Sequence, residues 1–290
     1  MQLQLLDSLT LPGDSAKPNE DSFAVGGRMA TVFDGATGLG ENLMPGPSDA
    51  HWLAQFGARR LRAHADANDG TPRDWLRAAA GDAAKSFAAL RHRAPQEQYE
   101  MPFASLMLAA LDGDRLNLLW FGDCIALFRT KASPFALFGD AMERRARERN
   151  RVTQLVKPNG REGAAPSSGP AAAGRRDVFL PALRASRNRV NTDGEWLFAP
   201  DPACAAHAKE AQAIAAPGAR LLLASDGFLA LASDYERYTP ESLFIAACTR
   251  GLEGLGEELR QIEAADPEGL RYPRFKRSDD ATALLLSVAA

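Results

Sequence analysis

The chain has 290 residues, of which 46% are hydrophobic, so it has enough apolar material to bury a core in one large domain or two modest ones. Its 34 Lys and Arg residues nearly balance its 37 Asp and Glu residues, so its overall charge draws it neither to nucleic acid nor to an anionic membrane. The opening segment MQLQLLDSLTLPGD has no basic residue and no long apolar run, and no later stretch is apolar over the length of a bilayer. We therefore expect a cytoplasmic protein without a signal peptide and without a nucleic-acid or membrane partner.

The chain begins with the patterns of β-strands. Residues 3–9 form a short apolar segment, and residues 23–25 and 29–33 flank the turn pair Gly26-Gly27. A β-rich start is predicted.

Two helices and a group of strands are expected next. One helix begins near Asp49, and the other is capped by Thr71 with Pro72 in its first turn. Residues 103–138 consist of short apolar runs separated by Asp-Gly and Gly-Asp turns, which predicts three or four antiparallel strands.

The segment from about 141 to 190 has a different composition. It is rich in Arg and contains the stretch GAAPSSGPAAAG, which can form little packed core. This predicts an insertion or flap. The Arg run at 144–151 is most simply a solvated helix face; the alternative is a basic surface that receives a phosphorylated or acidic partner.

The remainder of the chain mixes helical and strand patterns. We expect a helix over 202–215, a buried strand over 220–224, helices over 241–250 and 252–264, and a closing strand over 282–288. Strands at both ends of the chain, with helix pairs between them, predict a layered α+β sandwich whose first and last strands meet in one sheet.

Four acidic motifs share one local design, in which an apolar strand begins or ends at a carboxylate beside a small residue. The motifs are PNEDSF with Glu20 and Asp21, TVFDG with Asp34 and Gly35, LLLASDG with Asp226, and RSDDATALLL with Asp279 and Asp280. Each motif alone is explained by an ordinary turn. Together, clustered carboxylates would repel unless hard divalent cations neutralised them, and one carboxylate can bridge two such ions about 3.5 to 4 Å apart. The residues leave both interpretations open.

Five segments carry a resemblance to a known family. PNEDSF, VFDG, GDCIALF, ASDGFLAL and DDATALLLSV occur in the order and spacing of the NED, DG, GDSRA, SDG and D(D/N)xT motifs of the 2C-type metal-dependent protein phosphatases. The variant DGATG resembles a bacterial branch. The match spans essentially the whole chain, so the resemblance implies one catalytic domain over 1–290, with a flap at about 141–190. It implies a four-layer αββα sandwich of two antiparallel sheets flanked by helix pairs.

The same resemblance implies an activity and a ligand set. The activity is hydrolysis of phosphoserine and phosphothreonine esters by a water held between two Mn²⁺ or Mg²⁺ ions, without a phosphoenzyme. Asp34 would bridge the ions and Gly35 would offer its carbonyl to one of them. Asp226 and Asp279 would hold the other ion.

Further acidic and hydroxyl residues are implied around this pair of ions. Glu20 and Asp21 would act through metal-bound water. Asp280 lies where the family has Asp or Asn, so Asp279 is taken as the ligand and Asp280 as its neighbour. Thr282 would support the ligands by fixing the loop that carries them.

The chain departs from the family pattern at several positions. Ala36 stands where the family often has a His that protonates the leaving group. Asp123 matches a third-metal position, but the expected partner is Ala230, so a third ion would bind weakly. Ala16 and Lys17 stand near the position of an Arg that holds the phosphate, and Lys17 is the expected, weaker substitute.

Two other functions remain open from the sequence. These departures are compatible with a catalytically weak or silent relative that serves as a binding or regulatory module. A phosphatase for a small phosphomonoester is the other alternative, because no specificity motif separates it from a phosphatase that acts on phosphorylated proteins.

Overall fold

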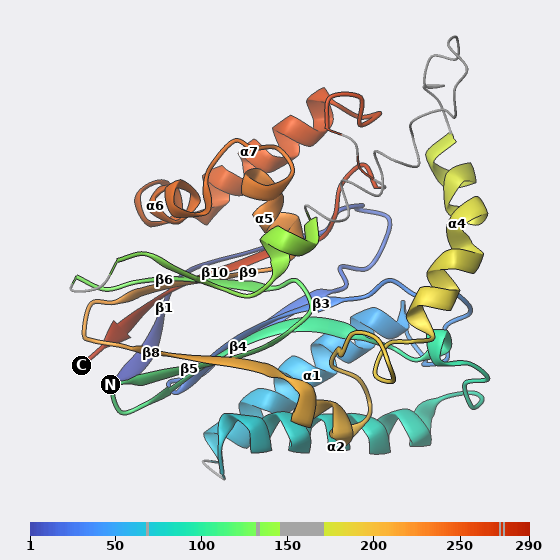
Figure 1. Ribbon diagram of the computed structural model, residues 1–290, viewed down its shortest axis with the longest axis horizontal. Helices are drawn as coiled ribbons and strands as arrows, with labels where there is room; N and C mark the ends of the chain where they lie inside the picture. The colour runs from blue at the N-terminus through green and yellow to red at the C-terminus, as the bar shows by residue number, and fades with distance from the viewer. Residues whose placement is uncertain (68–69, 132–133, 146–170, 273, 275) are drawn as a thin grey trace.

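Two five-stranded antiparallel sheets form the centre of the molecule (Figure 1). The computed structural model describes residues 1–67, 70–131, 134–145, 171–272, 274 and 276–290. The first sheet contains, in spatial order, β1 (Gln2–Leu11), β10 (Ala281–Ala289), β9 (Arg220–Ala224), β6 (Ile125–Arg129) and β7 (Ala136–Phe138). The second contains β2 (Asp21–Val25), β3 (Met29–Gly35), β4 (Ala104–Asp112), β5 (Arg115–Phe121) and β8 (Lys209–Ile214).

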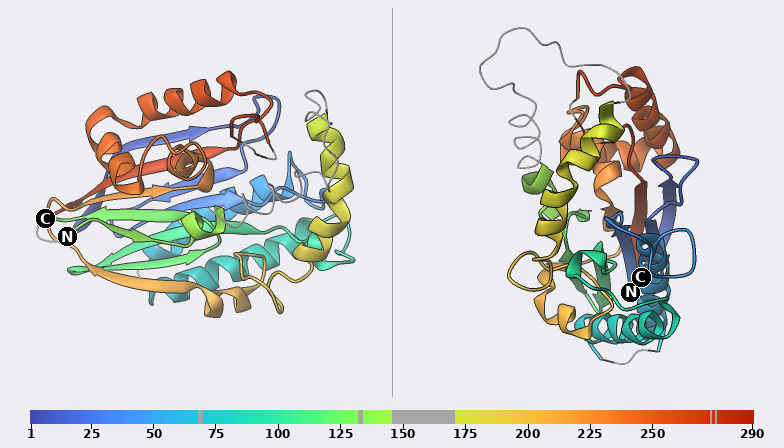
Figure 2. Two further views of the ribbon diagram at one scale, coloured as in Figure 1. Left: turned by 45° about the horizontal axis from the view of Figure 1, so that its top comes forward. Right: turned by 90° about the vertical axis from the view of Figure 1, so that its right-hand side faces the viewer.

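Helices cover the outer face of each sheet (Figures 1 and 2). Against the second sheet lie α1 (Asp49–Asp66) and α2 (Pro72–Leu90), and against the first lie α5 (Asp226–Ser233), α6 (Pro240–Arg250) and α7 (Leu252–Ala265). The short helices η1 (Gln98–Glu100) and η2 (Pro202–His207) belong to connections, and α4 (Ala171–Arg187) stands at one end of the sandwich. No helix in the described part of the chain is long and apolar enough to cross a bilayer.

The starts of the first two helices are confirmed. Ser48 caps α1, where its side chain accepts a hydrogen bond from the amide of His51. Thr71 and Asp74 form a capping box at the start of α2, with Pro72 in the first turn. These caps satisfy amide groups that have no partner within the helix.

Alternation along the strands divides the core into three apolar layers. Val32 and Leu284 belong to the layer between the two sheets. Phe33 faces the opposite way and packs with α1 and α2, while Leu285 packs with α5, α6 and α7. Successive side chains of a strand point to opposite faces, so strands such as β10 are apolar on both sides. The predicted αββα sandwich is confirmed.

The ends of the chain pair as predicted. β1 runs antiparallel to β10, from Gln2 opposite Ala289 to Leu11 opposite Ala281. β10 in turn pairs with β9. The chain therefore needs both of its ends to complete the first sheet.

The strands predicted over 103–138 are present, but they do not form one meander. β4 and β5 belong to the second sheet, whereas β6 and β7 belong to the first. The chain crosses between the sheets at Gly122 and Asp123. Gly122 has φ of +70°, and a Cβ at this position would lie 2.0 Å from Ser105 Oγ, so only glycine fits the crossing.

The helix predicted over 202–215 is wrong. Only η2 is helical, and Lys209–Ile214 forms the edge strand β8, which pairs with β5. Its sequence KEAQAI alternates between more and less exposed residues. Hydrogen bonds to β5 override the helix propensity of Ala, Glu, Lys and Gln.

Helix α5 is absent from the sequence prediction. It has eight residues, DGFLALAS, and all but the first are buried. Such a short, uniformly apolar segment has no helical period to detect.

The predicted flap at 141–190 lies in large part outside the described residues. Residues 141–145 are helical, and α4 follows the undescribed part. Arg184 of α4 donates to the Leu39 carbonyl at 3.0 and 2.8 Å, and its guanidinium carbon lies 4.6 Å from the centre of the Tyr99 ring. This end of α4 is thus anchored to the loop that follows β3. The extent of the insertion stays a prediction.

Gly227→Ala should destabilise the fold, because a Cβ at this position would lie 1.9 Å from the Asp280 carbonyl oxygen. Backbone atoms must move to relieve this overlap, and we expect the free energy of unfolding to fall by about 3 kcal/mol. Gly254→Ala is the matched control: Gly254 lies within α7 with no atom near the added Cβ, and this change should stabilise by up to about 1 kcal/mol. Urea unfolding of both variants measures the difference, and equal stability would contradict the packing described.

Candidate metal centre

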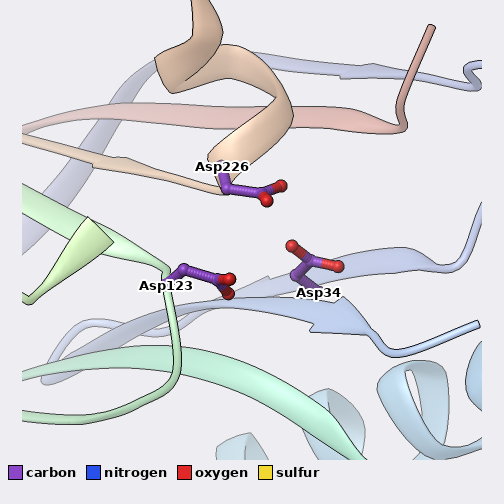
Figure 3. A group of neighbouring side chains, drawn as sticks. All are labelled: Asp34, Asp123 and Asp226. Atoms are coloured by element: carbon purple, nitrogen blue, oxygen red, sulfur yellow. The ribbon is translucent and has the colours of Figure 1, made fainter. Parts of the chain in front are cut away.

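Three carboxylates from separate elements converge at one end of the space between the sheets (Figure 3). Asp34 lies near the end of β3, Asp123 follows β5, and Asp226 is the first residue of α5. Each offers a ligand oxygen, and these oxygens all lie within 4.8 Å of one another. We call these three residues the carboxylate cluster.

Strand alternation and two turns place the cluster. Asp34 shares strand parity with Val32, which packs between the two sheets, so its carboxylate points into the space between them. β9 ends at Ala224, and Ser225 then occupies the N-cap position of α5 without a side-chain hydrogen bond to the helix, which places Asp226 in the first helical turn. Asp123 lies where the chain crosses from one sheet to the other.

Burial and mutual repulsion make the cluster electrostatically unfavourable. Burial raises the pKa of Asp34 well above its ordinary value, and the charges of Asp226, Asp21 and Asp123 raise it further. Burial also raises the pKa of Asp226 to about 7, although Arg145 opposes this shift. Carboxylates in this state bind cations or protons, and oxygen donors suit Mg²⁺ and Mn²⁺. The residues therefore fit a divalent metal site.

Asp279 lies next to the cluster and forms an ion pair with Lys276. Its Oδ1 accepts a hydrogen bond from Lys276 Nζ at 2.8 Å. Although burial opposes the effect, Lys276 holds the pKa of Asp279 below its ordinary value. The charge of Asp279 also raises the pKa values of Asp34 and Asp226, so it lies within electrostatic range of both.

Asp21 takes part in a buried hydrogen-bond network between the sheets. It lies opposite Asp34 in the pairing of β2 with β3. Its Oδ2 accepts from Ser225 Oγ at 2.8 Å, and Ser225 Oγ accepts from the Thr282 amide at 2.9 Å. The Thr282 hydroxyl lies 2.9 Å from that of Thr10. This network joins β1, β2 and β10 to Ser225, the residue between β9 and α5. Burial raises the pKa of Asp21 well above its ordinary value, against the hydrogen bond from Ser225.

Glu20 is oriented by two hydroxyl groups. Its Oε2 accepts from Thr37 Oγ1 at 2.6 Å and its Oε1 accepts from Ser48 Oγ at 2.7 Å. Ser48 also caps α1, so the start of that helix positions the carboxylate.

Asp280 binds two backbone amides of the loop between β1 and β2, one near each end of that loop. Its Oδ1 accepts from the Gly13 amide at 2.8 Å, and its Oδ2 accepts from the Glu20 amide at 2.6 Å. Both of its oxygens are used in this way, which favours Asp279 as the metal ligand of the pair.

Gly35 has a packing role that the sequence did not indicate. A Cβ here would lie 2.7 Å from the Glu20 carbonyl oxygen and 2.8 Å from that of Ala50. The Gly35 amide donates to the same Glu20 oxygen at 3.0 Å. Its carbonyl as a metal ligand stays a prediction.

Lys17 is exposed, with 72% of its side chain accessible, and its Nζ lies 3.6 Å from Asp14 Oδ2. Its role in binding phosphate stays a prediction.

Several residues at the site are missing from the sequence prediction. Arg145 Nη2 lies 2.6 Å from Asp226 Oδ2, and Ser105 Oγ donates to Asp123 Oδ1 at 2.6 Å. Arg145 belongs to a run interpreted most simply as a solvated helix face, and Ser105 lies in an apolar strand without a motif. Lys276 stands close to the RSDD motif, and this proximity is the one signal that could have identified it.

The raised pKa values of Asp34 and Asp226 should make the metal-free chain less stable at neutral pH than in mild acid. In the unfolded chain both carboxyl groups have a pKa of about 3.9. In the folded chain their pKa values are higher, so they keep their protons to higher pH. The folded state therefore binds more protons between about pH 4 and pH 7, and the free energy of unfolding falls as pH rises through this range. Carboxyl groups with lowered pKa values, such as Glu100 with a pKa of about 2, titrate below this pH range.

Melting curves in chelator from about pH 5 to pH 8 check this expectation. The melting temperature should fall with rising pH, and Asp34→Asn should reduce the slope because one titrating group is removed. A melting temperature that rises over the same interval in the parent chain would contradict the electrostatics described.

Comparison with solved structures identifies a shared fold. The serine/threonine phosphatase PstP/Ppp of Mycobacterium tuberculosis superposes with a TM-score of 0.57 at 16% identity, over 100% of both chains. The catalytic domain of PstP in complex with two manganese ions gives a TM-score of 0.54 at 14% identity, over 100% of this chain and 99% of the other. The phosphatase MsPP from Mycobacterium smegmatis, in complex with cacodylate, gives 0.53 at 16% identity, over 98% of this chain and 99% of the other.

The sequence matches no protein-family model and no curated protein. The likeness is therefore one of architecture, over essentially the full length of each chain compared. The chain has the fold of the PPM-type, or 2C-type, serine/threonine phosphatases that its motifs resemble.

Proposed function

We propose that the chain is a metal-dependent phosphatase of the 2C type that hydrolyses phosphoserine and phosphothreonine esters. The observation that carries this proposal is the convergence of Asp34, Asp123 and Asp226 within 4.8 Å. Keeping like charges together in a buried site costs stability, and a module that only binds a partner has no need of it. The shared fold and the order of the motifs support the same function.

The proposed cofactors are two Mn²⁺ or Mg²⁺ ions. Asp34 would serve both ions, Gly35 would offer its carbonyl to one, and Asp226 and Asp279 would hold the other. When bound, such ions acidify a water molecule and neutralise charge on a phosphoryl group. Asp123 lies close enough to Asp34 and Asp226 to contribute an oxygen to the same site.

The surrounding residues would keep these ligands in position. Glu20, oriented by Thr37 and Ser48, would act through water held at the site. Asp280 fixes the loop that carries Glu20 through its backbone amide. Asp21 and Ser225 tie the start of β2 to the start of α5.

Asp34→Asn tests the proposal because it separates catalysis from folding. Loss of the shared carboxylate should lower hydrolysis of a chromogenic phosphomonoester with Mn²⁺ by about a thousandfold or more. The metal-free variant should melt at or above the temperature of the metal-free parent, because one repelling charge is removed. Activity assays and melting curves with and without Mn²⁺ on the same preparations measure both effects.

The controls also separate the alternative functions. If the folded parent hydrolyses no phosphomonoester with Mn²⁺ or Mg²⁺, the chain is a silent binding module. If it hydrolyses small phosphomonoesters but no phosphoserine or phosphothreonine peptide, it is a small-molecule phosphatase. Full activity of Asp34→Asn would exclude a metal role for this residue.

The presence of Ala36 after Gly35 leads to a second prediction about the reaction. No imidazole follows Gly35 to protonate a leaving alkoxide, so rates should fall much more for alkyl esters such as phosphoserine than for aryl esters. Ala36→His should raise the alkyl rate selectively, by about tenfold to a hundredfold. Rates on a series of esters of graded leaving-group pKa measure this dependence. Equal rates on both classes in the parent would show that another acid is present.

A further inference from the structure

Two cationic side chains form ion pairs with the carboxylates that the proposed function assigns to one metal ion. Arg145 Nη2 lies 2.6 Å from Asp226 Oδ2, and Lys276 Nζ lies 2.8 Å from Asp279 Oδ1. The Arg145 and Asp226 side chains are largely buried, with 17% and 14% exposed. Lys276 also lies 3.4 Å from Thr37 Oγ1, the hydroxyl that orients Glu20.

The contact between Arg145 and Asp226 differs from an ordinary surface ion pair. Exposed pairs such as Lys17 with Asp14 join two groups that water would otherwise solvate. Asp226 instead belongs to a set of mutually repelling carboxylates and is only 14% exposed, whereas the Lys276 and Asp279 side chains are 50% and 37% exposed. The Arg145 and Lys276 charges therefore offset part of the repulsion within the metal-free site.

A divalent ion and the guanidinium compete for Asp226. The guanidinium lies 2.6 Å from Oδ2, and an ion held by the same carboxylate would repel a positive charge at this distance. Binding of a cation should consequently release Arg145, and the same reasoning applies to Lys276 on Asp279.

Helix α5 gives the released guanidinium a second anchor. Asp226, Ala230 and Asp234 are spaced four residues apart, so they lie along one face of the helix. Arg145 Nε is already 3.7 Å from Asp234 Oδ2. Ala230 adds only a methyl group between the two carboxylates. Arg145 can therefore leave Asp226 and stay beside the site.

We propose that Arg145 and Lys276 are exchangeable counter-ions of the metal site, which hold Asp226 and Asp279 in the metal-free chain and bind the substrate's phosphate once cations take those carboxylates. This inference rests on the proposed function. Guanidinium groups bind phosphate oxygens through paired N–H donors, and ammonium groups bind them as point charges. Arg145 thereby supplies the bidentate phosphate contact for which Ala16 and Lys17 provide no arginine.

The first measurement is calorimetric titration of Mn²⁺ into the full metal-free chain, without substrate. Arg145→Gln and Lys276→Gln should each bind Mn²⁺ more tightly than the parent, by about tenfold, because a competing charge a few ångström away is removed. Arg144→Gln and Lys85→Gln are the matched controls. Arg144 Nη1 donates to Glu195 at 2.8 Å, and Lys85 is an exposed residue of α2, so both variants should keep the affinity of the parent.

The second measurement is titration of inorganic phosphate into the Mn²⁺-loaded chains. Arg145→Gln and Lys276→Gln should bind phosphate about tenfold more weakly, because a charge-assisted contact is lost. Arg145→Lys should lie between Arg145→Gln and the parent, because it keeps the charge but not the paired donors. Circular dichroism and melting curves confirm that each variant is folded before it is compared.

The outcomes distinguish this inference from the proposed function. A folded parent that binds no Mn²⁺ overturns the proposed function. A parent that binds Mn²⁺, with parental Mn²⁺ affinity in Arg145→Gln and Lys276→Gln, overturns the exchange and leaves the proposed function intact. Tighter Mn²⁺ binding with unchanged phosphate affinity overturns the phosphate role.

Discussion

Repulsion among partly buried carboxylates is the constraint on which the rest of the structure depends. Asp34 and Asp123 come from the second sheet and the crossing that leaves it, and Asp226 comes from the helix after β9. Bringing their charges within a few ångström is unfavourable, so the apolar layers on both faces of each sheet must supply the opposing stability. Hydrogen bonds from hydroxyl groups, such as Ser105 to Asp123, then orient the carboxylates without adding charge.

The local sequence pattern correctly predicts those helices and strands whose tertiary surroundings favour the same secondary structure. The caps at Ser48 and Thr71 and the alternation that ends at Asp34 are local signals, and the structure uses each of them. Lys209–Ile214 has no β-branched residue except its last, and it is extended because β5 has a free edge beside it. That edge is a property of the assembled sheet, so the segment itself carries no sign of it.

The residues of the metal centre likewise fall into two groups, those that the sequence predicts and those that it does not. The carboxylates stand in short motifs of fixed order, which made them recognisable before their positions in space were known. Lys276 lies only three residues from Asp279, but Arg145 and Ser105 come from distant parts of the chain without motifs of their own. Arg145 meets Asp226 only after the chain has crossed between the sheets and returned through β8 and β9. The role of Arg145 within its arginine-rich run therefore follows from the fold and cannot be inferred from the sequence alone.

The position of β10 between β1 and β9 has a consequence for how the first sheet assembles. β10 comes after β1 and β9 in the sequence, yet it is an inner strand that supplies Thr282 to the buried network and follows the Asp279-Asp280 pair. Until it is inserted, β1 and β9 have no partner between them, and the longest-range contacts of the chain are missing. The loop that carries Asp279 is therefore fixed beside Asp226 only when β10 has inserted between β1 and β9. Assembly of the carboxylates thus depends on the pairing of two strands that are far apart in the sequence, β1 and β10.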